Sequence, residues 1–291
     1  MKRFIKHTTL IICIIILSGC TLLKKDDFDG IDIYTTVYTI EYITKTLYGE
    51  YSNINSIYPD SIDIQDYVIT NKKINEFSKA RLFIYNGLNK EKEIAASLIN
   101  KNKKLNIIDV SQGLEIKNDE NELWISPSNC LMIAQNIKNG LKEYITNSSI
   151  LENIDKNYEE LKIKISEFDA ELKLVAENAT NKSLIVTSNA FNFLNKYGFE
   201  VINVNSTDDE DASSTALSRA KKAFYSKENT YLFILNTTDE EEKNITSLVN
   251  NGATIVRINP MINITDEERK EGIDYIAFMK DFLDAIKKEV Y

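Results

Sequence analysis

Apolar and polar residues follow two different periods along most of the chain. Short apolar runs of the kind that form buried strands stand at residues 31–36, 81–85, 105–110, 184–187, 200–204, 231–235 and 254–258. Between these runs, apolar residues recur at spacings of three and four, which is typical of amphipathic helices. Because strands and helices alternate, the pattern predicts an α/β fold with mainly parallel sheets flanked by helices.

The longest helical pattern lies in the middle of the chain. Its apolar residues are Leu151, Ile154, Tyr158, Leu161, Ile165, Phe168, Leu172 and Val175. Neither Gly nor Pro interrupts them, and the stripe predicts one helix of about 28 residues and about 42 Å. A coiled-coil seam is the alternative, but a helix between two strand–helix regions packs more often along its own protein. We therefore predict two lobes joined by one long rigid helix.

Several helix ends carry local signals. Thr238 to Glu241 and Thr265 to Glu268 both have the capping-box pattern, which predicts that a helix begins at each. Ser126-Pro127 predicts an N-cap followed by the first helical residue. Gly198 is expected to end the helix that precedes it.

The first 29 residues have the pattern of an export and lipidation signal. A short cationic segment is followed by an apolar run that is too short to span a bilayer, and the run ends in Leu17-Ser18-Gly19-Cys20. This lipobox predicts cleavage before Cys20 and lipid on its thiol. At least two acyl chains would then hold the protein on the outer face of the cell membrane. An ordinary signal peptide or a short anchor helix is the alternative.

The expected organisation follows from these patterns. We predict a signal peptide at residues 1–19, a lipidated tether at 20–29, an N-terminal α/β lobe at 30–148, the connecting helix at 149–179 and a C-terminal α/β lobe at 180–291.

Composition narrows the possible functions. Loss of residues 1–19 changes the net charge from −9 to −12, which argues against a nucleic-acid partner. The only histidine, His7, lies in the predicted signal peptide, so the mature chain cannot form a catalytic arrangement that needs histidine. Cys130 lies in an apolar helical pattern and is expected to be a buried apolar side chain. Because Cys20 is committed to lipid, no internal disulfide is expected in the mature chain. We predict a monomer that is not an enzyme.

Five segments, in order along the chain, resemble motifs of one protein family. They are Thr35–Ile40, Pro59–Thr70, Ala80–Gly87, Glu120–Pro127 and Thr187–Leu194. In this order and spacing they are similar to the zinc- and manganese-binding solute receptors of ABC importers, also called adhesion lipoproteins. The resemblance covers nearly the whole mature chain. It implies a two-lobed fold, a cleft that holds the ligand, and an ABC permease as partner.

The chain departs from the family at the positions that the resemblance assigns to metal ligands. The three family histidines correspond to Gln65, Glu122 and Ser188, and the family carboxylate falls near Asn259. Imidazole suits zinc, whereas neutral oxygen ligands suit it poorly. We therefore expect these four residues to lie in the cleft without a zinc or manganese ion, and we expect no cofactor.

Three functions fit this sequence. The preferred one is an extracytoplasmic solute-binding lipoprotein of the metal-importer family with a degenerate transition-metal site. The second is a working metal receptor with oxygen ligands, drawn from Asp63, Asp66 or Glu122. The third is a surface adhesion or scaffold lipoprotein that binds no small ligand.

Overall fold

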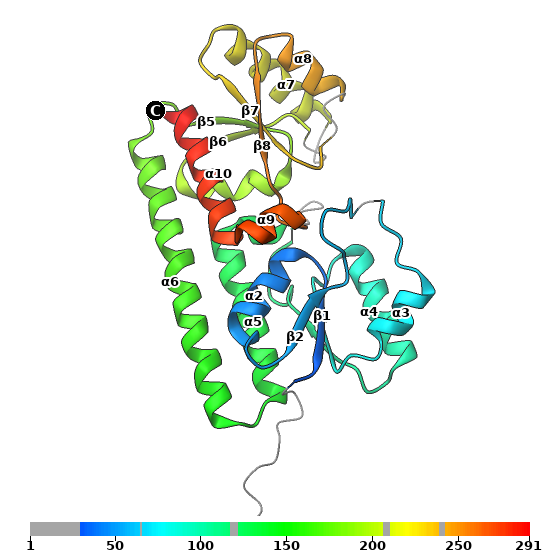
Figure 1. The fold of residues 1–291 in the computed structure, drawn as a ribbon. Helices are drawn as coiled ribbons and strands as arrows, with labels where there is room; N and C mark the ends of the chain where they lie inside the picture. The colour runs from blue at the N-terminus through cyan, green and yellow to red at the C-terminus, as the bar shows by residue number, and fades with distance from the viewer. Residues whose placement is uncertain (1–29, 65, 117–121, 206–209, 239–241) are drawn as a thin grey trace, which may run out of the picture.

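The computed structural model describes residues 30–291, except residues 65, 117–121, 206–209 and 239–241. Two four-stranded parallel sheets form the centres of two lobes (Figure 1). The predicted fold class is confirmed. The signal peptide and the tether lie outside the described residues, and the lobe boundaries given above stay a prediction.

The N-terminal lobe is built on a sheet in the order β2-β1-β3-β4. Its strands are β1 (Asp32–Thr35), β2 (Asn53–Ser56), β3 (Leu82–Tyr85) and β4 (Asn106–Asp109). Its helices are α2 (Tyr38–Tyr48), α3 (Asn71–Phe77), α4 (Asn89–Lys101), the 3-10 helix η2 (Leu123–Ile125) and α5 (Pro127–Tyr144). All four residues of β3 are buried, as expected of a central strand covered on both faces.

The C-terminal lobe repeats the same strand order, as β6-β5-β7-β8. Its strands are β5 (Ser183–Val186), β6 (Glu200–Asn203), β7 (Tyr231–Leu235) and β8 (Thr254–Ile258). Its helices are the 3-10 helix η3 (Asn189–Tyr197), α7 (Glu210–Tyr225), α8 (Lys243–Val249), α9 (Asp266–Glu271) and α10 (Tyr275–Val290). The carboxyl ends of both sheets face the region between the lobes (Figure 1).

One helix, α6 (Ser148–Asn178), runs beside both lobes (Figure 1). Its buried residues include the apolar stripe from Ile154 to Val175, so the predicted long helix is confirmed. The side chain of Asn147 caps its first turn by accepting hydrogen bonds from the backbone N–H groups of Ser149 and Ile150. One apolar core continues from the N-terminal sheet across α6 to α10, which joins the two lobes into one packed body.

Some of the predicted helix ends are confirmed and others are not. Thr265 forms a complete capping box with Glu268, and Gly198 ends η3 in the left-handed conformation, both as predicted. The prediction at Thr238 was wrong, because α8 begins only at Lys243, after Glu242. Pro127 is the first residue of α5, but the Ser126 hydroxyl contacts Ser128 rather than capping the helix.

Candidate solute-binding pocket between the lobes

A cavity of about 330 Å³ opens where the two lobes meet. From the N-terminal lobe it is lined by the loop that follows β2, and from the C-terminal lobe by the residues that follow β7 and β8. The described lining residues are Ser61, Ile62, Asp63, Ile64, Asn236, Thr237, Asn259, Pro260, Ile262, Asn263, Ile264, Thr265 and Glu268. Carboxyl ends of parallel strands are where open α/β sheets bind ligands, so this cavity is the candidate site.

A larger cavity of about 640 Å³ lies between α6 and α10. Its described lining residues include Phe168 and Met279, but not Glu122, Ser188 or Asn259. We assign the site to the smaller cavity, because only that one stands at the strand ends and takes residues from both lobes.

The polar groups of the pocket are mainly neutral amides and hydroxyls. Asn236 and Thr237 directly follow β7, and Asn259 directly follows β8. Two carboxylates, Asp63 and Glu268, complete the polar lining. Such groups can donate and accept hydrogen bonds around a small polar solute.

Several of the polar lining side chains form hydrogen bonds within the protein, and Glu268 and Asn259 are two of them. The Oε2 atom of Glu268 accepts hydrogen bonds from the N–H and the hydroxyl of Thr265, both at 2.8 Å. The Oδ1 atom of Asn259 accepts a hydrogen bond of 2.8 Å from the N–H of Met261. Glu268 therefore shapes the wall through its capping role, and Asn259 directs its side-chain oxygen back to the chain.

The four predicted cleft residues are only partly brought together. Asn259 lines the pocket, whereas Glu122 and Ser188 are not among its described lining residues. Glu122 immediately precedes η2, and Ser188 caps η3 by accepting a hydrogen bond from the N–H of Ala190 at 3.2 Å. Gln65 lies outside the described residues.

Helix η2, which follows Glu122, is bonded to a segment that lines the pocket, and η3 follows Ser188. The segments η2 and η3 contact each other. The indole N–H of Trp124 in η2 donates a hydrogen bond of 2.7 Å to the carbonyl of Pro260, one residue after Asn259. The positions of Glu122 and Ser188 in a shared solute site stay a prediction.

Some residues that line the pocket were not predicted from the sequence. Asn236 and Thr237 follow the apolar run of β7, and the rule that ligands bind at strand ends was the signal that would have identified them. Asp63, one of the carboxylates named for an oxygen-ligand site, does line the pocket, whereas Asp66 is not among its described lining residues.

The donor set does not match what zinc prefers. Within the described ranges, no group of three or more His, Cys, Asp or Glu side chains is placed to hold a metal ion. Residues 20–291 contain no histidine. Cys130 is fully buried in α5, and burial raises the pKa of its thiol to about 12, which keeps it protonated at neutral pH.

A second polar cluster lies at the strand ends of the N-terminal lobe. The Oε2 atom of the Glu91 carboxyl group in α4 accepts a hydrogen bond of 2.8 Å from the N–H of Asn86, which follows β3. Burial raises the pKa of Glu91 to about 8, against the lowering effect of hydrogen bonds from Thr36 and Asn86, and the nearby Asp109 raises it further. Glu91 is therefore largely protonated at neutral pH.

Comparison with known proteins identifies the family. The model of the family of zinc-uptake complex component A, periplasmic (ZnuA), matches residues 33–289. The high-affinity zinc uptake system protein ZnuA of Bacillus subtilis (strain 168) is 25% identical in an alignment 285 positions long, which covers 89% of this chain and 87% of that protein. The manganese ABC transporter substrate-binding lipoprotein PsaA of Streptococcus mitis is 28% identical in an alignment 309 positions long, gaps included, which covers 98% of each protein.

Solved structures show the same fold. The metal-dependent lipoprotein YcdH from Bacillus subtilis superposes with a TM-score of 0.73 at 22% identity, covering 90% of this chain and 99% of that one. The Zn(II)-bound ZnuA-like domain of Streptococcus pneumoniae AdcA gives a TM-score of 0.72 at 21% identity, with 90% and 99% covered.

Proposed function

Since the chain belongs to the family of periplasmic zinc-uptake components, we propose that it is a lipid-anchored solute receptor whose ancestral transition-metal site has degenerated. The observation that carries this proposal is the chemistry of the interlobe pocket. Asn259 lines it where the family resemblance expects a carboxylate, and the mature chain has no histidine to supply imidazole. Solute and partner recognition are retained in this proposal, while tight zinc or manganese binding is lost.

The test is metal binding by the mature chain, measured by native mass spectrometry and by thermal unfolding with zinc, manganese or calcium. A nanomolar site at a thousandfold excess of ligand over Kd would stabilise the fold by about 4 kcal/mol. We expect zinc and manganese to leave the melting temperature almost unchanged. One tightly bound zinc ion per chain at neutral pH would overturn the proposal.

A second function is favoured by one observation: Asp63 and Glu268 both line the pocket. Hard cations such as calcium and manganese bind oxygen ligands, so these carboxylates support a metal receptor with an all-oxygen site. In that case calcium or manganese should bind the mature chain, and Asp63→Asn should abolish the binding. The matched control is Asp284→Asn, which removes an exposed carboxylate of α10 that is not among the described lining residues of the pocket.

The placement of the ancestral site can be tested separately. Replacing Gln65, Glu122 and Ser188 together with histidine should create zinc affinity if these positions converge beside Asn259. If the triple variant binds zinc no better than the unmodified chain, these positions do not form one site.

Anchoring and partners complete the proposal. We propose that lipid on Cys20 holds the receptor on the outer face of the cell membrane and that an ABC permease receives its solute. PsaA of Streptococcus mitis is by name an ABC transporter lipoprotein. Cys20→Ala should prevent incorporation of labelled fatty acid, and label in that variant would contradict the lipobox assignment. Among the described residues, no helix is long and apolar enough to cross a membrane.

A further inference from the structure

The chain that follows β8 leaves its own lobe and bonds to the other one. We call residues 259–274 the strap. The carbonyl of Met261 accepts hydrogen bonds from the N–H of Thr39 at 3.3 Å and from its hydroxyl at 2.8 Å. The N–H of Tyr38 donates to the carbonyl of Ile262 at 2.9 Å. The strap therefore belongs to the C-terminal lobe by sequence and to the N-terminal lobe by contact.

The strap also holds the loop that follows β2. We call residues 59–64 the cleft loop. The N–H of Ser61 donates to the carbonyl of Ile264 at 2.9 Å, and the N–H of Asp266 donates to the Ser61 hydroxyl at 3.0 Å. The side-chain amide of Asn263 donates to the carbonyl of Ile62 at 2.7 Å. These hydrogen bonds join two segments that are about 200 residues apart in sequence.

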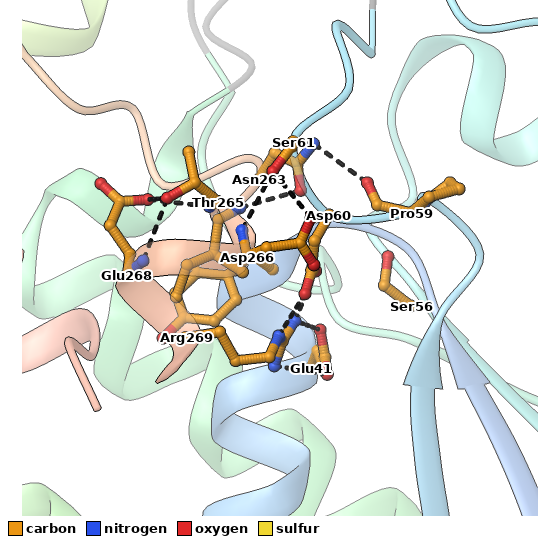
Figure 2. A network of polar contacts seen from close by, with 12 residues as sticks. Glu41, Ser56, Pro59, Asp60, Ser61, Asn263, Thr265, Asp266, Glu268 and Arg269 are labelled. Carbon is orange, nitrogen blue, oxygen red and sulfur yellow. Dashed lines mark hydrogen bonds and ion pairs between the residues drawn. The ribbon is translucent and has the colours of Figure 1, made fainter. Parts of the chain in front are cut away.

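Arg269 in α9 links the strap to the cleft loop and to α2 by binding two carboxylates (Figure 2). Its Nε and Nη2 atoms bind the two carboxylate oxygens of Asp60 at 2.5 and 2.7 Å. Its Nη1 and Nη2 atoms bind Glu41 in α2 at 3.2 and 3.1 Å. Glu41 is only 3% exposed and also binds Lys45 at 2.5 Å. A planar guanidinium can hold two carboxylates in fixed directions, whereas an ammonium cannot.

Two of the three described non-glycine residues with positive φ lie in the same two segments, and the third is Lys227. Ser61 has φ 63° and Met261 has φ 55°, so both adopt the left-handed conformation that non-glycine residues avoid. Such strained residues persist where the surrounding contacts over-determine them. One of them lies in the cleft loop and the other in the strap.

The cleft loop and the strap build most of the pocket. Four of the thirteen described lining residues come from the cleft loop and seven from the strap, so these segments supply eleven in all. We propose that Arg269 is a positioning residue for the pocket: it locks the cleft loop and the strap into one unit, so that the wall exists before a solute arrives. This inference rests on the proposed function only in taking the pocket as the solute site.

Preorganisation of this kind would reduce the ordering cost of binding. The pocket wall would belong to the N-terminal lobe as a preformed surface. Among the described lining residues, only Asn236 and Thr237 would reach it from the sheet of the other lobe. The function of Arg269 is then indirect, since it does not line the pocket itself.

Hydrogen–deuterium exchange of the mature chain tests this unit without any ligand. In Arg269→Gln, amides of residues 59–64 and 259–266 should exchange at least about tenfold faster, while α5 and β7 keep their protection. In Arg269→Lys, the exchange rates of these amides should lie between those of the unmodified chain and those of Arg269→Gln, because one ammonium can replace only part of the paired contacts. The control Arg219→Gln breaks an exposed arginine–carboxylate pair with Glu200, 2.6 Å apart, and should change neither segment.

Two results would overturn the inference. One is unchanged exchange in both segments of Arg269→Gln. The other is an equal rise in exchange throughout both lobes, which would make Arg269 a general stabilising residue. If Arg269→Gln does not fold, Asp60→Asn keeps the Arg269–Glu41 pair and should release residues 59–64 alone. The exchange experiment needs no solute. A negative exchange result would therefore leave the proposed solute receptor untouched, and a negative metal-binding result would leave the role of Arg269 untouched.

Discussion

Two glutamates of the N-terminal lobe show how surroundings decide the state of a carboxyl group. Glu41 is buried between Lys45 and Arg269, so its negative charge is balanced by two cations. Glu91 instead receives hydrogen bonds from neutral groups and lies near the carboxylate of Asp109. Burying a charge without a counter-charge is costly, and the carboxyl group of Glu91 responds by keeping its proton.

The raised pKa of Glu91 predicts a stability that depends on pH. Between pH 4.5 and about 8 the unfolded chain loses this proton while the folded chain keeps it, so Glu91 lowers stability progressively as pH rises through that window. Below the window the effect is absent, and above it the effect is complete. Glu91→Gln cannot titrate, so its stability relative to the unmodified chain should rise by about 2 kcal/mol or more between pH 5 and pH 8.5.

Urea denaturation at these two pH values measures the difference. The exposed Glu93 lies on the same helix, and Glu93→Gln is the matched control, for which we expect the same pH dependence as in the unmodified chain. An unchanged pH profile in Glu91→Gln would show that this carboxyl group is already ionised in the folded protein.

At the scale of elements, α6 depends on its position against both lobes more than on its own helix propensity. Isolated helices gain little from local bonds in water, and an amphipathic face stabilises them by packing. Ile165 faces the core and is 1% exposed, while Ile163 on the same helix is 57% exposed. Substitution of each isoleucine therefore distinguishes the contribution of packing from that of helix propensity, because both lie within one turn of the same helix.

Ile165→Ala should lower the free energy of unfolding by about 2–4 kcal/mol, because it removes buried methyl groups and leaves a cavity. Ile163→Ala should change it by less than about 0.5 kcal/mol. Chemical denaturation of both variants makes the comparison. Similar effects of the two substitutions would contradict the packing of α6 described above.

At the scale of the whole molecule, the lobes are linked more closely than two separate sheets suggest. One apolar core runs through both lobes and α6, and the strap adds polar bonds across the junction. Trp124, the only tryptophan, is 2% exposed and bonds to the strap at Pro260. Its fluorescence therefore reports on the junction itself.

We predict that the lobes unfold as one cooperative unit. Thermal unfolding followed by circular dichroism, which reports on all helices, should coincide with the transition followed by Trp124 fluorescence. The calorimetric and van't Hoff enthalpies should then agree. Two separated transitions would mean that each lobe is stable alone and that the shared core contributes little.

The sequence by itself determined the features that depend on local pattern. The spacing of apolar residues located α6 and seven of the strands, and the order of short motifs indicated the family. The absence of histidine after residue 19 followed from composition alone and limits the chemistry of any site. The apolar pattern did not predict β2, because its residues Asn53–Ser56 carry only one buried apolar side chain. Its pairing with β1 defines it as a strand.

Only the tertiary structure decided which polar residues share the pocket. Asp63, Asn236 and Asn259 are separated by long stretches of chain and meet only when both sheets direct their strand ends to the junction. The sequence also did not predict three other features. These are the start of α8 at Lys243, the return of the strap to the other lobe, and the pairing of Arg269 with Glu41 and Asp60. The physical reason is that periodicity reports each residue's local environment, whereas these contacts depend on the packing of segments that sequence spacing does not relate.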